Sequence, residues 1–307
     1  MVLAVLVLTG LRLFAVTSVQ PQPALTGTTM FDLLKVAFAV VAGGGGLVAL
    51  VTAYRRQRVG EAAEARERTA LFNERFATLT DKLGHAEATV RLAGVHGLAG
   101  LADDAPSRAL RQTCIDVLCA YLRLPFDPDD DGLAGQCMRE VRRTVVRCVA
   151  AHLRDGARTS WQGYDFDFTG AIFDGGDFAL ATFGGGSVVF AQARFCLGRV
   201  SFRGVRFAGA SVDFRDAAFS GADVDFTEAR FTAGSVDFGQ AAFTGGSVVF
   251  SGAVFEPGVA DFRRAAFAQG SRADFQTATG PAPEGLLEGT RRLKEVLLPR
   301  TWLSSSR

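Results

Sequence analysis

The residues best suited to binding a metal ion form an acidic loop. Asp127, Asp129 and Asp131 alternate as in the first half of an EF-hand calcium loop, and Gly132 follows at the position where that loop has its invariant glycine. Calcium also needs a bidentate Glu at the twelfth position, where this sequence has Met138. We therefore expect a solvated loop between two helices, and no metal.

Thiol and imidazole groups could supply a zinc site or a nucleophile, but their spacing favours neither. The five cysteines include no C-x-x-C pair, and the three histidines form no H-E-x-x-H motif. We expect the cysteines to be buried as small apolar residues and the histidines to lie in the core or on the surface. These residues are Cys114, Cys119, Cys137, Cys148 and Cys196, with His85, His96 and His152.

Hydroxyl groups are frequent between residues 165 and 275, but that stretch has no histidine to activate one as a nucleophile. The glycine-rich run at 184–187 lacks the lysine and the helix that a phosphate-binding loop requires. No catalytic constellation is present in the sequence, so we expect a protein that is not an enzyme and has no cofactor.

These polar residues are set among phenylalanines that recur at spacings of five and seven. A small or β-branched apolar residue stands two positions before nearly every Phe, which places both on one side of an extended backbone. Turn-forming residues follow each Phe, so each strand is short, and a fixed short period predicts a solenoid. We expect its interior to be filled by Phe173, Phe190, Phe195, Phe202, Phe207, Phe214, Phe219, Phe226, Phe231, Phe238, Phe243, Phe250, Phe255 and Phe262.

Units such as Ala171-Ile172-Phe173 and Ala193-Arg194-Phe195 resemble the pentapeptide-repeat family, whose unit is roughly A-(D/N)-(L/F)-x-x. The resemblance implies a right-handed quadrilateral β-helix. From Phe183 onward the spacings of five and seven alternate, so two units of each length make a coil of about 24 residues. We expect the rings to stack in columns, with the added dipeptides bulging at two opposite corners.

The N-terminal region predicts a membrane anchor. Residues 36–54 are uncharged and long enough to span the hydrocarbon core. Residues 2–19 are apolar apart from Arg12, and three fates remain open for them: a second span, a cleaved signal peptide, or neither. Arginines cluster directly after the span at 36–54, whereas residues 20–32 contain no Lys or Arg, which predicts a cell-membrane protein whose residues after 55 are cytoplasmic.

The rest of the chain suggests helices on either side of the solenoid. Amphipathic segments are expected at 86–102, after Pro106-Ser107 and at 139–153, and a short amphipathic helix at 286–298 that either caps the solenoid or belongs to a tail. This order of parts resembles a group of bacterial membrane-anchored pentapeptide-repeat proteins. The expected domains are a membrane anchor (1–58), a charged juxtamembrane helix (59–84), a small helical domain capping the solenoid (85–160), the β-helix (161–275), and a C-terminal cap or tail (276–307).

A candidate acidic face consists of Asp213, Asp237 and Asp261, which recur 24 residues apart, with Asp225 across the coil. Some pentapeptide-repeat proteins imitate the negative surface of DNA and act on DNA gyrase, and this is the alternative function. Residues 165–275, however, hold 13 Asp or Glu against 9 Arg, and the whole chain has a net charge of +1.

We therefore expect a non-enzymatic, membrane-tethered scaffold that presents a rigid β-helix surface to a cytoplasmic protein partner. We do not expect it to bind nucleic acid directly. The sequence indicates neither the identity of the partner nor the oligomeric state.

Overall fold

The computed structural model describes residues 27–290 and 293–304, so the apolar stretch at 2–19 lies outside the described residues. The chain divides after Glu67 into two compact units. Helix α2 (Gly27–Leu83) begins in the first unit and ends in the second. The expected span and the expected charged helix are therefore parts of one continuous helix, which the glycine run at 43–46 does not interrupt.

Three further helices follow in the second unit: α3 (Ala88–Asp103), α4 (Arg108–Arg123) and α5 (Leu133–Leu153). The Ser107 hydroxyl caps α4 by accepting a hydrogen bond from the Leu110 amide at 3.3 Å. Helix α5 begins earlier than the expected residue 139. Leu133, Ala134 and Gln136 in its first turn are exposed, so this turn adds little to the apolar periodicity that predicts a helix.

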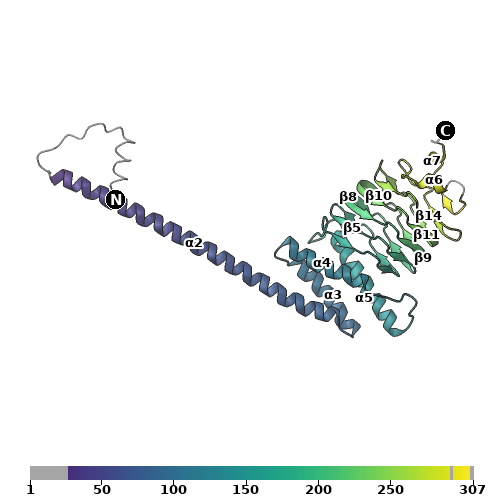
Figure 1. Ribbon diagram of the computed structural model, residues 1–307, viewed down its shortest axis with the longest axis horizontal. Helices are drawn as coiled ribbons and strands as arrows, with labels where there is room; N and C mark the ends of the chain where they lie inside the picture. The colour runs from purple at the N-terminus through teal and green to yellow at the C-terminus, as the bar shows by residue number, and fades with distance from the viewer. Residues whose placement is uncertain (1–26, 291–292, 305–307) are drawn as a thin grey trace. The chain divides into compact units, whose positions relative to one another are not determined.

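Residues 166–297 form two parallel sheets that wind into a β-solenoid of about five turns (Figure 1). The seven-stranded sheet contains β1 (Phe166–Asp167), β4 (Thr182–Phe183), β5 (Ser187–Val189), β8 (Arg206–Asp213), β10 (Arg230–Asp237), β12 (Val254–Phe255) and β13 (Ala260–Asp261). The nine-stranded sheet contains β2 (Ile172–Phe173), β3 (Gly176–Asp177), β6 (Arg194–Phe195), β7 (Arg199–Ser201), β9 (Ala218–Asp225), β11 (Ala242–Val249), β14 (Ala266–Phe267), β15 (Arg272–Asp274) and β16 (Val296–Leu297).

The strand register confirms the coil of about 24 residues, because each strand pairs with the strand one coil further along. Val188 lies opposite Val212, and Val212 lies opposite Val236. The phenylalanine rings stack with the same period in four columns, with centroids 4.4–5.5 Å apart. The columns are Phe183, Phe207, Phe231 and Phe255; Phe168, Phe190, Phe214, Phe238 and Phe262; Phe173, Phe195, Phe219, Phe243 and Phe267; and Phe178, Phe202, Phe226, Phe250 and Phe275.

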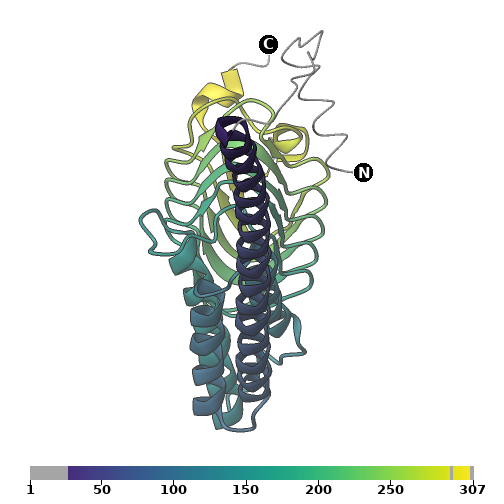
Figure 2. The same ribbon diagram turned by 90° about the vertical axis from the view of Figure 1, so that its left-hand side faces the viewer.

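The corners of the coil alternate between tight and wide. At a tight corner the Ala193 amide donates to the Phe190 carbonyl at 3.0 Å, and the intervening Gln192 has a φ of 58°. The wide corners carry the added dipeptides, and in the middle coils they lie inside the eight-residue strands β8 to β11 instead of in separate loops. The pairing between these strands contains register shifts, which are typical of β-bulges. Figure 2 shows the turns of successive coils repeating along the solenoid.

The helices of the second unit lie against the first coil, where the buried Arg142 of α5 joins them to the solenoid. Its Nη2 donates to the carbonyls of Leu122 and Ile172, both at 2.7 Å, and its Nη1 donates to the Tyr121 carbonyl at 3.4 Å. Two of these carbonyls end helix α4 and the third belongs to β2. Arg142 therefore fixes the end of one helix to the first coil.

The C-terminal segment differs from the single helix expected at 286–298. It forms helix α6 (Leu286–Thr290), strand β16 and helix α7 (Arg300–Ser304). Strand β16 pairs with β15, because the last sheet has an open edge that an extended segment can extend. Trp302 of α7 is buried against Phe255 and Phe275, with ring centroids 6.0 and 6.1 Å away, so this segment covers the last coil.

Candidate functional site

The solenoid interior is occupied by its own side chains. All fourteen phenylalanines expected there are no more than 2% exposed. Neighbouring columns also meet edge to face, as Phe190 and Phe202 do at 5.9 Å. The stacked rings fill the interior, so any binding by the solenoid must involve its outer surface.

The carboxylates of the candidate acidic face first serve the fold. Asp213 lies opposite Asp237, and Asp237 opposite Asp261, so the three form one row along the solenoid. Each accepts a hydrogen bond from the backbone amide two residues on, at 2.7–2.8 Å. That amide belongs to a tight corner, so the row of Asp residues stabilises the turns.

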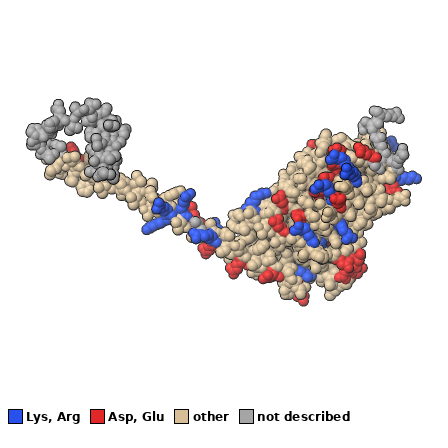
Figure 3. All heavy atoms as spheres, in the orientation of Figure 1, with Lys and Arg blue, Asp and Glu red and all other residues tan. Residues whose placement is uncertain are grey.

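Two arginines interleave with this row of three carboxylates and neutralise part of its charge. The guanidinium of Arg215 lies 2.6 Å from Asp213 and 3.7 Å from Asp237 in the next coil. Arg263 lies 2.5 Å from Asp261 and 3.7 Å from Glu284. Figure 3 shows acidic and basic side chains mixed on the visible face of the solenoid. This surface does not present the uniform negative charge of a DNA duplex.

The fourth residue of the candidate acidic face, Asp225, lies in the other sheet and is paired as well. Arg199 of the preceding coil donates to it at 2.7 Å, and the Thr227 amide donates at 2.9 Å. Burial raises the pKa of Asp225, but these hydrogen bonds and the arginine charge outweigh burial and hold the pKa below its ordinary value. The same balance, with Arg215 as donor, lowers the pKa of Asp213.

Cys114, Cys119 and Cys148 are buried as expected, whereas Cys137 and Cys196 are only half-buried. Burial raises the pKa of Cys114 to about 12 and raises that of Cys148 as well, so both remain protonated at neutral pH. His152 has a structural role: its ring stacks on Trp161 at 4.0 Å, and its Nε2 lies 3.1 Å from a carboxylate oxygen of Asp103.

The acidic loop before α5 uses its carboxylates locally. Asp127 accepts from the Asp129 amide at 3.0 Å, Asp130 accepts from the Gly132 amide at 2.9 Å, and Arg139 pairs with the loop at 3.1 Å through Asp131. Among the described residues, no group of three or more His, Cys, Asp or Glu side chains could hold a metal ion.

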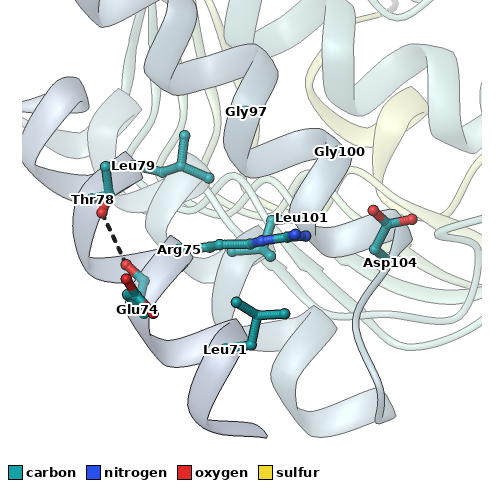
Figure 4. A pocket seen from close by; sticks show the side chains of 9 residues that line it. All are labelled: Leu71, Glu74, Arg75, Thr78, Leu79, Gly97, Gly100, Leu101 and Asp104. Carbon is teal, nitrogen blue, oxygen red and sulfur yellow. Dashed lines mark hydrogen bonds between the residues drawn. The ribbon is translucent and has the colours of Figure 1, made fainter. Parts of the chain in front are cut away.

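A groove of about 490 Å³ lies between the end of α2 and helix α3. Leu71, Leu79 and Leu101 provide its apolar lining, and the side chain of Arg75 extends into it (Figure 4). Gly100 also lines the groove, and a Cβ at this position would contact no atom within 4 Å. The lining also includes the polar side chains of Glu74, Thr78 and Asp104, and the Thr78 hydroxyl donates to the Glu74 carbonyl at 3.0 Å.

A second hollow, of about 400 Å³, lies where α5 crosses β3 and β7. Arg143, Arg147 and Arg199 line it, but each is already engaged. Arg147 lies 2.7 Å from Glu140, Arg199 lies 2.7 Å from an Asp carboxylate, and Arg143 donates to the Asp174 carbonyl at 2.8 Å. Of these three contacts, the hydrogen bond made by Arg143 joins α5 to the solenoid, whereas the other two lie within α5 and within the solenoid.

Comparison with known families identifies the repeat. Residues 168–218 match the family described as pentapeptide repeats (9 copies). Residues 168–218 are pentapeptide repeats. The pentapeptide-repeat geometry continues beyond the matched residues, since the ring columns extend without a break to Phe267 and Phe275. No curated protein and no solved structure matches the chain.

The other notable surface is the helix N-terminal to the pentapeptide repeats. Every described side chain from residue 27 to residue 71 is exposed, including Phe31, Phe38, Val41 and Leu50. By length and composition, this is the one described helix that could cross a membrane, with a mean hydropathy of 2.1 in its most apolar window.

Proposed function

We propose that the chain is a non-enzymatic, membrane-tethered scaffold whose pentapeptide-repeat solenoid presents a rigid surface to a cytoplasmic protein partner. The observation that carries the proposal is the exposed apolar portion of α2, which leads along one chain into a solenoid with a filled interior.

The apolar helix supports the tether on energetic grounds. Phe38 is 67% exposed, Val41 71% and Leu50 72%, and they belong to an unbroken apolar stretch. Soluble proteins rarely expose so large a contiguous apolar surface. In a bilayer the same side chains contact hydrocarbon, and the helix satisfies its own backbone hydrogen bonds.

The scaffold assignment is supported by how the outer surface is held. Ion pairs join successive coils, as between Arg203 and Glu228 at 3.6 Å and between Arg199 and Asp225 at 2.7 Å. Such pairs keep long side chains in a regular array, and regular solenoid faces are suited to binding proteins. The gyrase-directed alternative is less well supported, because arginines interrupt the row of carboxylates and neutralise part of its charge.

Membrane fractionation tests the tether. We expect the full-length protein to remain in the membrane pellet after alkaline carbonate washing and to be released by detergent. The double variant Val41→Arg/Leu47→Arg should move to the soluble fraction, because each Arg at mid-membrane costs about 2.5–3.5 kcal/mol. The matched control is Val59→Arg, at another exposed position of the same helix, which should stay in the pellet. Recovery of the wild type in the soluble fraction would overturn the proposal.

Orientation and partner are tested on the same material. A cysteine at the exposed Ser304, in a chain whose other cysteines are replaced by Ser, should react with a membrane-impermeant maleimide only after the cells are lysed. Photo-crosslinkers at exposed solenoid positions should capture a protein. Gyrase subunits among the products would support the alternative function.

A further inference from the structure

Three arginines form a basic collar where the apolar part of α2 ends: Arg55, Arg56 and Arg58. All three are exposed, and they lie within about 4.5 Å along the helix axis. At 100° per residue they cover roughly 160° of its circumference. The three arginines of the collar therefore lie at one level along the helix axis and on one side of the helix.

The collar has no acidic partner within the described part of the chain. The first carboxylate after it, Glu61, accepts a hydrogen bond from Gln57 at 3.1 Å instead of pairing with Arg58. The guanidinium of Arg58 lies over the ring of Tyr54, 5.7 Å from its centroid. Aromatic rings at such a position are typical of the interface between hydrocarbon and headgroups.

The other end of the apolar stretch is different. Lys35 lies 3.1 Å from the carboxylate of Asp32, so that end carries a neutral pair. The helix is thus apolar between one neutralised end and one end with three unpaired positive charges. A general need for polar residues at helix ends would not produce this asymmetry.

We propose that the collar of Arg55, Arg56 and Arg58 binds the phosphate groups of anionic phospholipids at one face of the bilayer. This inference rests on the membrane tether proposed above. Each guanidinium has five N–H donors in a planar fork that matches phosphate oxygens, and side chains beside the apolar helix lie at headgroup depth. Each basic side chain near an anionic membrane surface strengthens the binding of the protein to that surface by a factor of about five.

The test reconstitutes the full-length protein in phosphatidylcholine bilayers and measures the association of spin-labelled phosphatidylglycerol relative to spin-labelled phosphatidylcholine by electron paramagnetic resonance. We expect phosphatidylglycerol to be preferred, and less so as salt is raised. Replacing all three arginines (Arg55→Gln, Arg56→Gln, Arg58→Gln) should lower the preference by up to about fivefold for each arginine removed. The triple Lys variant should retain part of it.

The matched control is Lys35→Gln, which removes a positive charge from the paired end and should leave the preference unchanged. An unchanged preference in the triple Gln variant, or none in the wild type, overturns the lipid proposal while the tether stands. If the wild type is not retained in the bilayers at all, the tether and the lipid site both fail.

Discussion

Arg142 offers the sharpest test of how the helices are joined to the solenoid. Its side chain is buried, and its guanidinium binds three backbone carbonyls on α4 and β2. Replacement by Met keeps most of the volume of the side chain but removes every donor. We predict that Arg142→Met lowers the free energy of unfolding by about 3–5 kcal/mol, because each of the two 2.7 Å bonds from the charged group contributes about 1.5–3 kcal/mol.

Burying the charge of Arg142 costs free energy, so its removal offsets part of the stability that the lost hydrogen bonds contributed. Burial lowers the pKa of Arg142, although Asp174 nearby raises it, which shows that the charge is held in an unfavourable environment. Arg142→Lys should lose most of the same stability, since one ammonium group cannot replace a planar fork that binds two carbonyls at once. The matched control is Arg147→Met, on the same helix, whose exposed ion pair with Glu140 contributes below about 1 kcal/mol.

The two tryptophans allow the junction to be observed separately. Trp161 is buried beside the helices and Trp302 is buried at the last coil. In a Trp302→Phe background, denaturant unfolding of the detergent-solubilised protein followed by Trp161 emission reports on the helical end. Equal losses in Arg142→Met and Arg147→Met would refute the role assigned to Arg142.

Two further outcomes follow from the wide corners and from the paired carboxylates. Gly246→Ala should lower the free energy of unfolding by about 2–4 kcal/mol, because a Cβ there would lie 2.3 Å from the Ala222 carbonyl oxygen. Gly258 has a similar φ but no atom within 4 Å of such a Cβ, so Gly258→Ala should lower it by only about 1–2 kcal/mol. Thermal melts of the two variants measure the difference. Burial raises the pKa of Asp213 and Asp261, but hydrogen bonds from arginine outweigh burial and hold both pKa values below the ordinary 3.8. The two carboxylates therefore stabilise the fold at any pH above 3.8, and this stabilisation is lost as the pH falls toward their lowered pKa values. Melting temperatures measured through this acid range should therefore fall less steeply in Asp261→Asn than in the wild type, and identical slopes would contradict the pairing.

Much of the solenoid could be predicted because its interior repeats with the same spacing as its sequence. Phenylalanines 24 residues apart must stack once the coil closes, and Phe190 and Phe214 do so at 4.7 Å. The start of α4 was equally predictable, since Ser107 is a good helix cap and its hydroxyl is bonded as one.

Features that depend on contacts between distant segments could not be predicted. Arg142 resembles any other arginine of an amphipathic helix until α4 and β2 are placed around it. The local pattern of the C-terminal strand β16 is amphipathic and predicts a helix, whereas the open edge of the last coil favours an extended conformation. The 24-residue spacing predicts the acidic row, but the pairing of its carboxylates depends on an arginine reaching from one coil to the next.

The most direct test of the central claim, that phenylalanines stack inside a coil of about 24 residues, is to delete one whole coil. Removing residues 215–238 joins Phe214 to Gly239 and leaves every ring in its column. Removing residues 215–235 instead places Phe238 three positions after Phe214 and disrupts the spacing. We predict that the first deletion unfolds cooperatively with both tryptophans buried, and that the second exposes Trp302. Indistinguishable unfolding of the two proteins would contradict the stacked coil.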